Sequence, residues 1–209
     1  MKEPPIPGGK PFGILLAGGK SSRMGREKSL VVVAGQPLWK RQMALLRRCC
    51  RRVAVAAGER PNWLEEDAEW VADAQCGEGP VRGLLAALAW TQKAGAPQAL
   101  VLAVDLPRVS ETLLSSLLSD VRAGRGVILQ NEDWLDPLCA CYPVEALEPL
   151  RMLVEGGENK LQRLAARLAE EGLLAIRRLT PSESAEMFNM NTPADLTLLA
   201  ETLDATRNP

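Results

Sequence analysis

Two cations that follow a glycine pair near the start of the chain are the residues with the clearest chemistry. An apolar stretch at 12–16 leads into Ala-Gly-Gly at 17–19, and Arg23 and Lys28 come next. Glycines let backbone N–H groups approach phosphate oxygens, and fixed cations neutralise the remaining charge. The segment therefore predicts a site for a nucleoside triphosphate, and an ordinary strand-to-helix turn with basic neighbours is the alternative. Neither the P-loop pattern nor the Rossmann glycine pattern is matched in full.

Histidine is absent from the chain, and cysteine is sparse. The absence of histidine excludes Ser-His-Asp and Cys-His catalysis and every His-ligated metal site. Any reaction must therefore use carboxylates, lysine, arginine or a bound metal. The 5 cysteines form no C-x-x-C pair, so neither a disulfide framework nor a zinc site is expected. Cys139 and Cys141 alternate in an apolar stretch and are expected in the core.

Composition favours a cytoplasmic globular protein. Hydrophobic residues make up 46% of the chain and charged residues 24%, with a net charge of −1. With this net charge the chain has no excess of positive charge to attract nucleic acid or anionic lipid. No apolar run is long enough to span a bilayer, and the N-terminal MKEPPIPGGKP lacks a signal-peptide core. We therefore expect a cytoplasmic location, with no nucleic acid and no membrane as partner.

Alternating apolar patterns predict an α/β fold with a doubly wound, mostly parallel sheet flanked by helices. The closely connected strands after residue 125 are expected to make this sheet mixed. One domain is expected over 12–203, between a flexible tail at 1–11 and a C-terminal tail at 204–209. Strands are expected at 12–16, 52–57, 69–72, 99–104, 126–130, 137–142 and 173–179. Helices are expected at 37–50, 80–94, 111–123 (capped by Ser110), 144–154 and 160–171, with a last helix starting at Pro193.

Ligands of such sheets bind beyond the carboxyl ends of the strands, and this rule selects further residues. Asp73 follows one expected strand, and Asp105 directly follows another. Asp105 is equally suited to cap a helix or to bind Mg²⁺, which favours one or two carboxylates plus substrate phosphates. Asp73 suits a base or ribose edge or an indirect metal contact, and loop polarity is its alternative. Gly79 would let the backbone lie close to a flat base, and the late loop 189–191 could face the same site.

The lack of a histidine base fits one reaction class. A phosphate monoester has a second pKa of about 6, so at neutral pH it is already mostly an anionic nucleophile. If it attacks the α-phosphate of a nucleotide, no general base is required. Catalysis then reduces to positioning and electrostatic stabilisation, which a metal, Lys28, Arg23 and backbone amides can provide.

Four segments of the sequence together resemble a known family. The run LAGGKSSRMGREK at 16–28 resembles the LAGG-x-x-x-RMG signature of nucleotidyltransferases, which have a nucleotide-diphospho-sugar transferase-like fold. The segments GPVRGLLAAL at 79–88, VLAVDLPRVS at 101–110 and FNMNTPADL at 188–196 extend the similarity. Together they make the chain most similar to the molybdenum cofactor guanylyltransferases, over about residues 12–200.

The resemblance implies transfer of GMP from GTP to the phosphate of the molybdopterin cofactor, with Mg²⁺ and release of pyrophosphate. It also implies a molybdoenzyme or a cofactor-delivery protein as a partner. In this interpretation Arg23, Lys28 and Asp105 are catalytic, Asp105 binds the metal, and Asn189 and Asn191 contact the acceptor. The nucleotide-binding residues would be Leu16, Ala17, Gly18, Gly19, Lys28, Asp73, Gly79 and Asp105.

The chain departs from the family pattern at several positions. Glu27 stands where aspartate is usual, Ala103-Val104 replaces Pro-Cys, and Asp136-Pro137 lies where a His-Pro pair is common. Three alternatives stay open on the sequence. They are cytidylyl transfer to the same acceptor, nucleotidyl transfer to a sugar or alditol phosphate, and a non-catalytic nucleotide-binding role in cofactor delivery.

Overall fold

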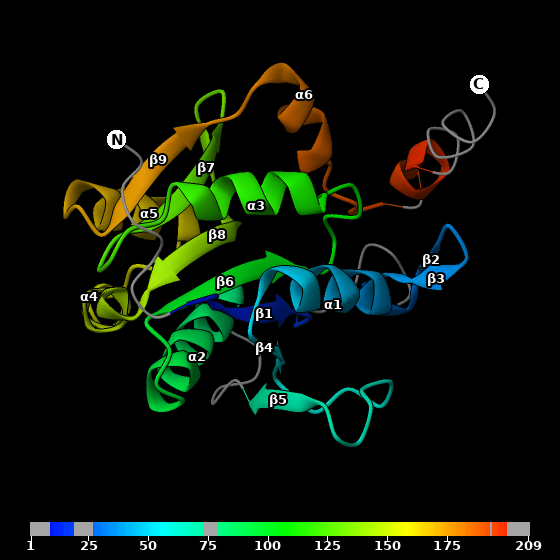
Figure 1. Cartoon of the computed structure of the whole chain (residues 1–209), viewed down its shortest axis with the longest axis horizontal. Coiled ribbons are helices and arrows are strands. Elements are labelled where there is room, and N and C mark those ends of the chain that lie inside the picture. The colour runs from blue at the N-terminus through cyan, green and yellow to red at the C-terminus, as the bar shows by residue number, and fades with distance from the viewer. Residues whose placement is uncertain (1–8, 19–26, 73–78, 193, 200–209) are drawn as a thin grey trace.

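A seven-stranded sheet forms the centre of the computed structural model, which describes residues 9–18, 27–72, 79–192 and 194–199. Its strand order is β5-β4-β1-β6-β8-β7-β9. Only β8 runs antiparallel to its neighbours, so the carboxyl ends of the other six strands meet at one edge (Figure 1). The strands are β1 (Phe12–Leu16), β4 (Arg52–Ala57), β5 (Glu69–Ala72), β6 (Gln98–Ala103), β7 (Gly126–Asn131), β8 (Trp134–Pro143) and β9 (Leu174–Arg178).

Helices cover both faces of the sheet, as expected for a doubly wound α/β fold. On one face lie α1 (Leu38–Cys49) and α3 (Glu111–Ser119), and on the other lie α2 (Pro80–Lys93), α4 (Leu147–Glu155) and α5 (Leu161–Glu170). The short helix α6 (Pro181–Ser184) follows β9. Each face has its own apolar core, and β6 is buried over its whole length between them. No helix in the described ranges is long and apolar enough to cross a bilayer.

Most of the expected elements are confirmed to within one or two residues, but α3 is shorter than expected. It ends at Ser119 rather than at 123, because the chain turns sharply before β7. The backbones of Arg122 and Arg125 form an antiparallel bridge across this turn, and Gly124 within it has a φ of +68°. Gly126 then starts β7 where a Cβ atom would lie 2.0 Å from the Cys141 carbonyl oxygen. Close strand contact therefore selects glycine here.

A small hairpin beside α1 was not expected. Strand β2 (Val32–Val33) pairs with β3 (Gln36–Pro37), and the turn between them uses Ala34 and Gly35 at positive φ. The hairpin follows the single 3₁₀ turn η1 (Lys28–Leu30). It completes the connection between the glycine loop and α1, a stretch too short to give a strand pattern in the sequence.

Candidate active site at the carboxyl edge of the sheet

Three side chains predicted to act together meet at the carboxyl edge of β1 and β6. Lys28 Nζ lies 2.7 Å from Asp105 Oδ2 and 2.6 Å from Asn191 Oδ1. The Lys28 and Asp105 side chains are only 19% and 21% exposed. An ion pair that is largely shielded from water is stronger than a surface pair. The site thus joins residues that are 77 and 163 positions apart in the sequence.

Asp105 is held by the backbone on both sides. The Val104 N–H donates to the Leu16 carbonyl at 3.1 Å. This hydrogen bond, which continues the pairing of β6 with β1, fixes the backbone directly before Asp105. The Asp105 carbonyl in turn accepts from the Met190 N–H at 2.9 Å. Val104 and Leu106 are both buried. The Asp105 side chain, which is partly exposed, thus lies between two buried residues.

Helix α1 supports the same turn from behind. Gln42 Nε2 donates to the Leu106 carbonyl at 2.5 Å, and Arg41 Nε donates to the Pro107 carbonyl at 3.2 Å. These two residues were not predicted from the sequence. Gln42 is 0% exposed and lies among apolar residues of α1, so a lone amide on the apolar face of the predicted helix was the available signal.

Glu27, the neighbour of Lys28, makes a contact with a tryptophan that was not predicted from the sequence. The Trp63 indole Nε1 donates to the carboxylate of Glu27, the residue directly before Lys28. Trp63 itself stacks on Trp39 of α1, with ring centroids 4.9 Å apart. Position 27, where the family pattern has aspartate, is thus occupied by a glutamate whose longer side chain contacts the Trp63 indole.

Asn191 begins a turn that leads into the last described helical stretch at 194–199. Asp195 Oδ2 accepts from the N–H groups of Asn191 and Thr192 at 2.8 and 2.7 Å, and the Asp195 N–H donates to Thr192 Oγ1 at 3.3 Å. These hydrogen bonds hold the Asp195 carboxyl pKa below its usual value. They form a reciprocal cap of the kind expected from Thr-x-x-acid. The helix predicted behind Thr192 is found at 194–199, while Pro193, its predicted first residue, lies outside the described residues. Asn189 lies exposed two residues before Asn191.

The first glycine turn lies beside this group, but not all of its backbone is available to a ligand. The Ala17 N–H donates to the Ala56 carbonyl at 3.0 Å, and the Leu16 carbonyl is used by Val104. Gly18 is the first exposed residue of the turn. We therefore expect Leu16 and Ala17 to shape the turn and phosphate contacts to begin at Gly18. Gly19, Arg23 and Asp73 lie outside the described residues.

Gly79 is the N-cap of α2, and its φ of +81° is a conformation that favours glycine. Pro80 then occupies the first turn, as expected. Within the helix, a Cβ atom at Gly83 would lie 3.3 Å from Leu16 Cδ2. This glycine lets α2 approach β1 closely, so the spacing of Gly79 and Gly83 has a structural reason beside any contact with a base.

The residues present fit a magnesium ion shared with substrate phosphates. Within the described ranges no three or more Asp, Glu or Cys residues gather into a protein-only metal site. Asp105 offers one partly exposed carboxylate. Mg²⁺ commonly takes one or two carboxylates and completes its shell with phosphate oxygens and water. Asp105 therefore suits a metal that arrives with a nucleotide rather than one held by the protein alone.

Asp136 is a half-buried carboxylate on β8 with no hydrogen-bond or ion-pair partner among the residues described. The pairing of β7 with β8 shifts between Ile128 and Leu129, and Asp136 stands opposite Leu129 directly after the shift. The next carbonyl, of Pro137, accepts from the buried Tyr142 hydroxyl at 2.8 Å, which fixes the backbone there. Burial raises the Asp136 pKa from 3.8 to about 6. The charged form of this residue is thus unfavourable in the folded chain.

We expect Asp136→Asn to stabilise the fold by about 3 kcal/mol at pH 7.5, since the carboxyl pKa rises from 3.8 to about 6 and each pKa unit corresponds to about 1.4 kcal/mol. The native carboxyl pKa lies above the unfolded one. The penalty is therefore complete above pH 6 and disappears below about pH 4. Urea unfolding at pH 7.5 and pH 4.5 measures the difference, and most of the gain should vanish at the lower pH. The exposed Asp133→Asn is the control, and an equal gain at both pH values would contradict the prediction.

Residues 13–172 match the family model described as MobA-like NTP transferase domain. The chain is 33% identical to the probable molybdenum cofactor guanylyltransferase of Opitutus terrae, over 88% of this chain and 91% of that protein. It is 34% identical to the molybdenum cofactor guanylyltransferase of Xanthomonas euvesicatoria, over 87% and 89% respectively.

A solved structure confirms the fold. Molybdopterin-guanine dinucleotide biosynthesis protein A from Archaeoglobus fulgidus is similar with a TM-score of 0.71 at 21% identity, covering 93% of this chain and 99% of that one. The doubly wound, mostly parallel mixed sheet expected from the sequence is thereby found in a nucleotidyltransferase-type protein. With the family model matching most of its length, the chain belongs to the MobA-like NTP transferase family.

Proposed function

We propose that the protein transfers GMP from GTP to the phosphate of the molybdopterin cofactor and releases pyrophosphate. The observation that carries this proposal is the meeting of Lys28, Asp105 and Asn191 beside the glycine turn. The two relatives described above, each similar over nearly its whole length, are named molybdenum cofactor guanylyltransferases. The acceptor and the nucleobase come to this chain from those names.

The reaction needs charge stabilisation rather than a general base. A phosphate oxygen of the acceptor attacks the α-phosphorus of GTP, and the bond from that phosphorus to the bridging oxygen breaks. The acceptor phosphate is already mostly dianionic at neutral pH, so no proton has to be removed. Lys28 faces the same edge as the glycine turn and would neutralise charge on the transferred group. Arg23 would assist from the same loop.

Asp105 would hold a magnesium ion together with the triphosphate. When bound, such an ion would supply positive charge that stabilises the pyrophosphate leaving group. In the structure Lys28 compensates the Asp105 carboxylate. During the reaction Lys28 would donate to a phosphate oxygen of the nucleotide. Asn189 and Asn191 would lie on the acceptor side of the site, and Asp73 and Gly79 would lie on the nucleoside side. The protein would act in the cytoplasm.

The test is pyrophosphate release with GTP, CTP and ATP in the presence of Mg²⁺, each combined with molybdopterin cofactor or with a sugar phosphate. Turnover that requires both GTP and the molybdopterin acceptor supports the proposal. Equal or faster turnover with CTP, or with the sugar phosphate, would replace it with the corresponding alternative. Calorimetric titration of the three nucleotides with Mg²⁺ separates base preference in binding from preference in turnover.

We expect Asn191→Ala to raise the KM for the acceptor about tenfold and the KM for GTP less than twofold, as for a lost hydrogen bond to a charged group. The Asn191 side chain contacts Lys28, and the residue is exposed, so it can also contact a substrate. Steady-state kinetics with each substrate varied in turn measures both values. A rise confined to GTP would place Asn191 on the nucleotide side instead.

A further inference from the structure

Residues 180–191 form a strap that runs from the end of β9, at one edge of the sheet, to Asp105 and Lys28 near its middle (Figure 1). It contains α6 and the 3₁₀ turn η3 (Ala185–Met187). Its far end carries Met190, whose N–H donates to Asp105, and Asn191, which accepts from Lys28. The position of Asn191 therefore depends on how this strap is fixed to the rest of the fold.

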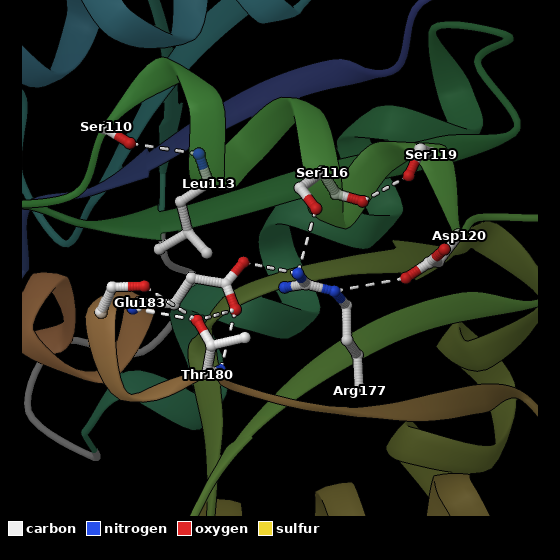
Figure 2. A network of polar contacts seen from close by, with 9 residues as sticks. Ser110, Leu113, Ser116, Ser119, Asp120, Arg177, Thr180 and Glu183 are labelled. Atoms are coloured by element: carbon white, nitrogen blue, oxygen red, sulfur yellow. Dashed lines mark hydrogen bonds and ion pairs between the residues drawn. The ribbon is translucent and has the colours of Figure 1, made fainter.

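Arg177 of β9 fixes the near end of the strap to the sheet and to α3. Figure 2 shows its guanidinium between α3 and Glu183 of α6. Nη2 donates to Glu183 Oε1 at 2.5 Å and to Ser116 Oγ at 3.0 Å, and Nε lies 3.3 Å from Asp120 Oδ2. The Arg177 and Glu183 side chains are 19% and 17% exposed. Arg177 thus connects β9, α3 and α6, and its contact with Glu183 is largely shielded from water, whereas Asp120 is 50% exposed.

Glu183 passes this constraint to the backbone of the strap. Its second oxygen, Oε2, accepts from the Thr180 N–H at 2.9 Å and from the Thr180 hydroxyl at 3.0 Å. The Glu183 N–H donates back to Thr180 Oγ1 at 3.3 Å, which completes a capping box. Helix α6 has no buried residue of its own. Polar contacts, with Arg177 at their centre, therefore hold the first turn of the strap.

Later anchors of the strap lie closer to the site. Glu186 accepts from the Ser110 N–H at 2.9 Å, and Met187 and Met190 are buried. The Arg108 guanidinium lies 4.4 Å from the centre of the Phe188 ring. Burial of the two methionines and the Glu186–Ser110 hydrogen bond stabilise the far half of the strap, while the contacts of Arg177 fix where the strap begins. An arginine fork is suited to that task because its planar geometry fixes angle as well as distance.

We propose that Arg177 is a positioning residue for the reaction, which sets the strap so that Asn191 and Met190 reach Lys28 and Asp105. This inference rests on the proposed function only for the identity of the substrates. Arg177 itself touches no group of the candidate site.

The experiment compares Arg177→Met and Arg177→Lys with the matched control Arg178→Met, whose side chain lies exposed on the next residue of β9. Amide hydrogen exchange at Met190 reports the bond to Asp105, and exchange at Val101 in the buried β6 reports global opening. We expect at least fivefold faster exchange at Met190 in Arg177→Met, an intermediate rate in Arg177→Lys, and no change at Val101 or in the control.

The kinetic readout is the KM for the acceptor, which should rise about fivefold to tenfold in Arg177→Met with the KM for GTP unchanged within twofold. Glu183→Gln should give a smaller rise, and the double variant should be no worse than Arg177→Met alone, because the two residues act as one unit. Unchanged exchange at Met190, equal acceleration at Val101, or the same effect in Arg178→Met would overturn the proposal. If the wild-type protein turns over no GTP with the molybdopterin acceptor, the proposed function fails, while the exchange result still decides the role of Arg177.

Discussion

Replacing Lys28 by alanine is expected to lower turnover by about 10²- to 10³-fold, the usual loss when one group stabilising transition-state charge is removed. In the structure Lys28 Nζ contacts both Asp105 and Asn191, so the cation is already aimed at the place where charge would develop. The KM for GTP should change much less than kcat if the ammonium group acts mainly on the transition state.

The same substitution leaves the Asp105 carboxylate without its ion-pair partner, and a loss of stability could imitate a loss of catalysis. Thermal unfolding and circular dichroism of Lys28→Ala therefore accompany the kinetics. Lys93→Ala is the matched control, because Lys93 is exposed at the end of α2. Wild-type turnover in Lys28→Ala, with the fold intact, would remove this lysine from the mechanism.

Lys28→Arg separates charge from geometry. Arginine keeps the positive charge, but its planar fork cannot place a single nitrogen between Asp105 Oδ2 and Asn191 Oδ1 as the compact ammonium group does. We therefore expect turnover between those of the wild type and Lys28→Ala. This ordering connects the two short distances in the site to the reaction rather than to charge alone.

The sheet could be predicted because its strands carry strong local patterns. β1 and, after Gln98, β6 are apolar, and both strands are buried in the structure, as strands covered on both faces must be. Asp105 could be predicted as a site residue for a related reason, since a carboxylate directly after such a strand reaches the ligand-binding edge. Residues that end a buried strand or open a helix thus have positions that follow from sequence.

The supporting contacts could not be predicted, because they join side chains whose distance depends on the tertiary fold. Gln42 and the Leu106 carbonyl are 64 residues apart, and Arg177 and Ser116 are 61 apart. Neither pair has a spacing that a helix or strand would impose. Trp63 and Glu27 meet only because a loop after β4 folds over the turn before α1. Such positioning residues are visible only once the elements are packed.

Asp105→Asn is expected to lower turnover at least 10²-fold and to raise the Mg²⁺ concentration needed for half-maximal rate. The amide is nearly isosteric and its oxygen can still accept from Lys28, while the Asp105 backbone bond to Met190 is unaffected. The substitution therefore removes the negative charge and little else. Pyrophosphate release measured over a range of Mg²⁺ concentrations tests both expectations, with the exposed Glu171→Gln as control.

The outcome of this substitution also separates an enzyme from a nucleotide-binding partner. A carboxylate that binds the metal of a metal–nucleotide complex loses affinity for that metal when its charge is removed, so extra Mg²⁺ should restore part of the rate. A carboxylate that only anchors Lys28 would give a loss that Mg²⁺ does not alter. Equal pyrophosphate release by the variant and the wild type would instead favour the non-catalytic alternative. Because Lys28 and Asp105 contact each other directly in the structure, the effect of replacing both should be smaller than the sum of the two single effects.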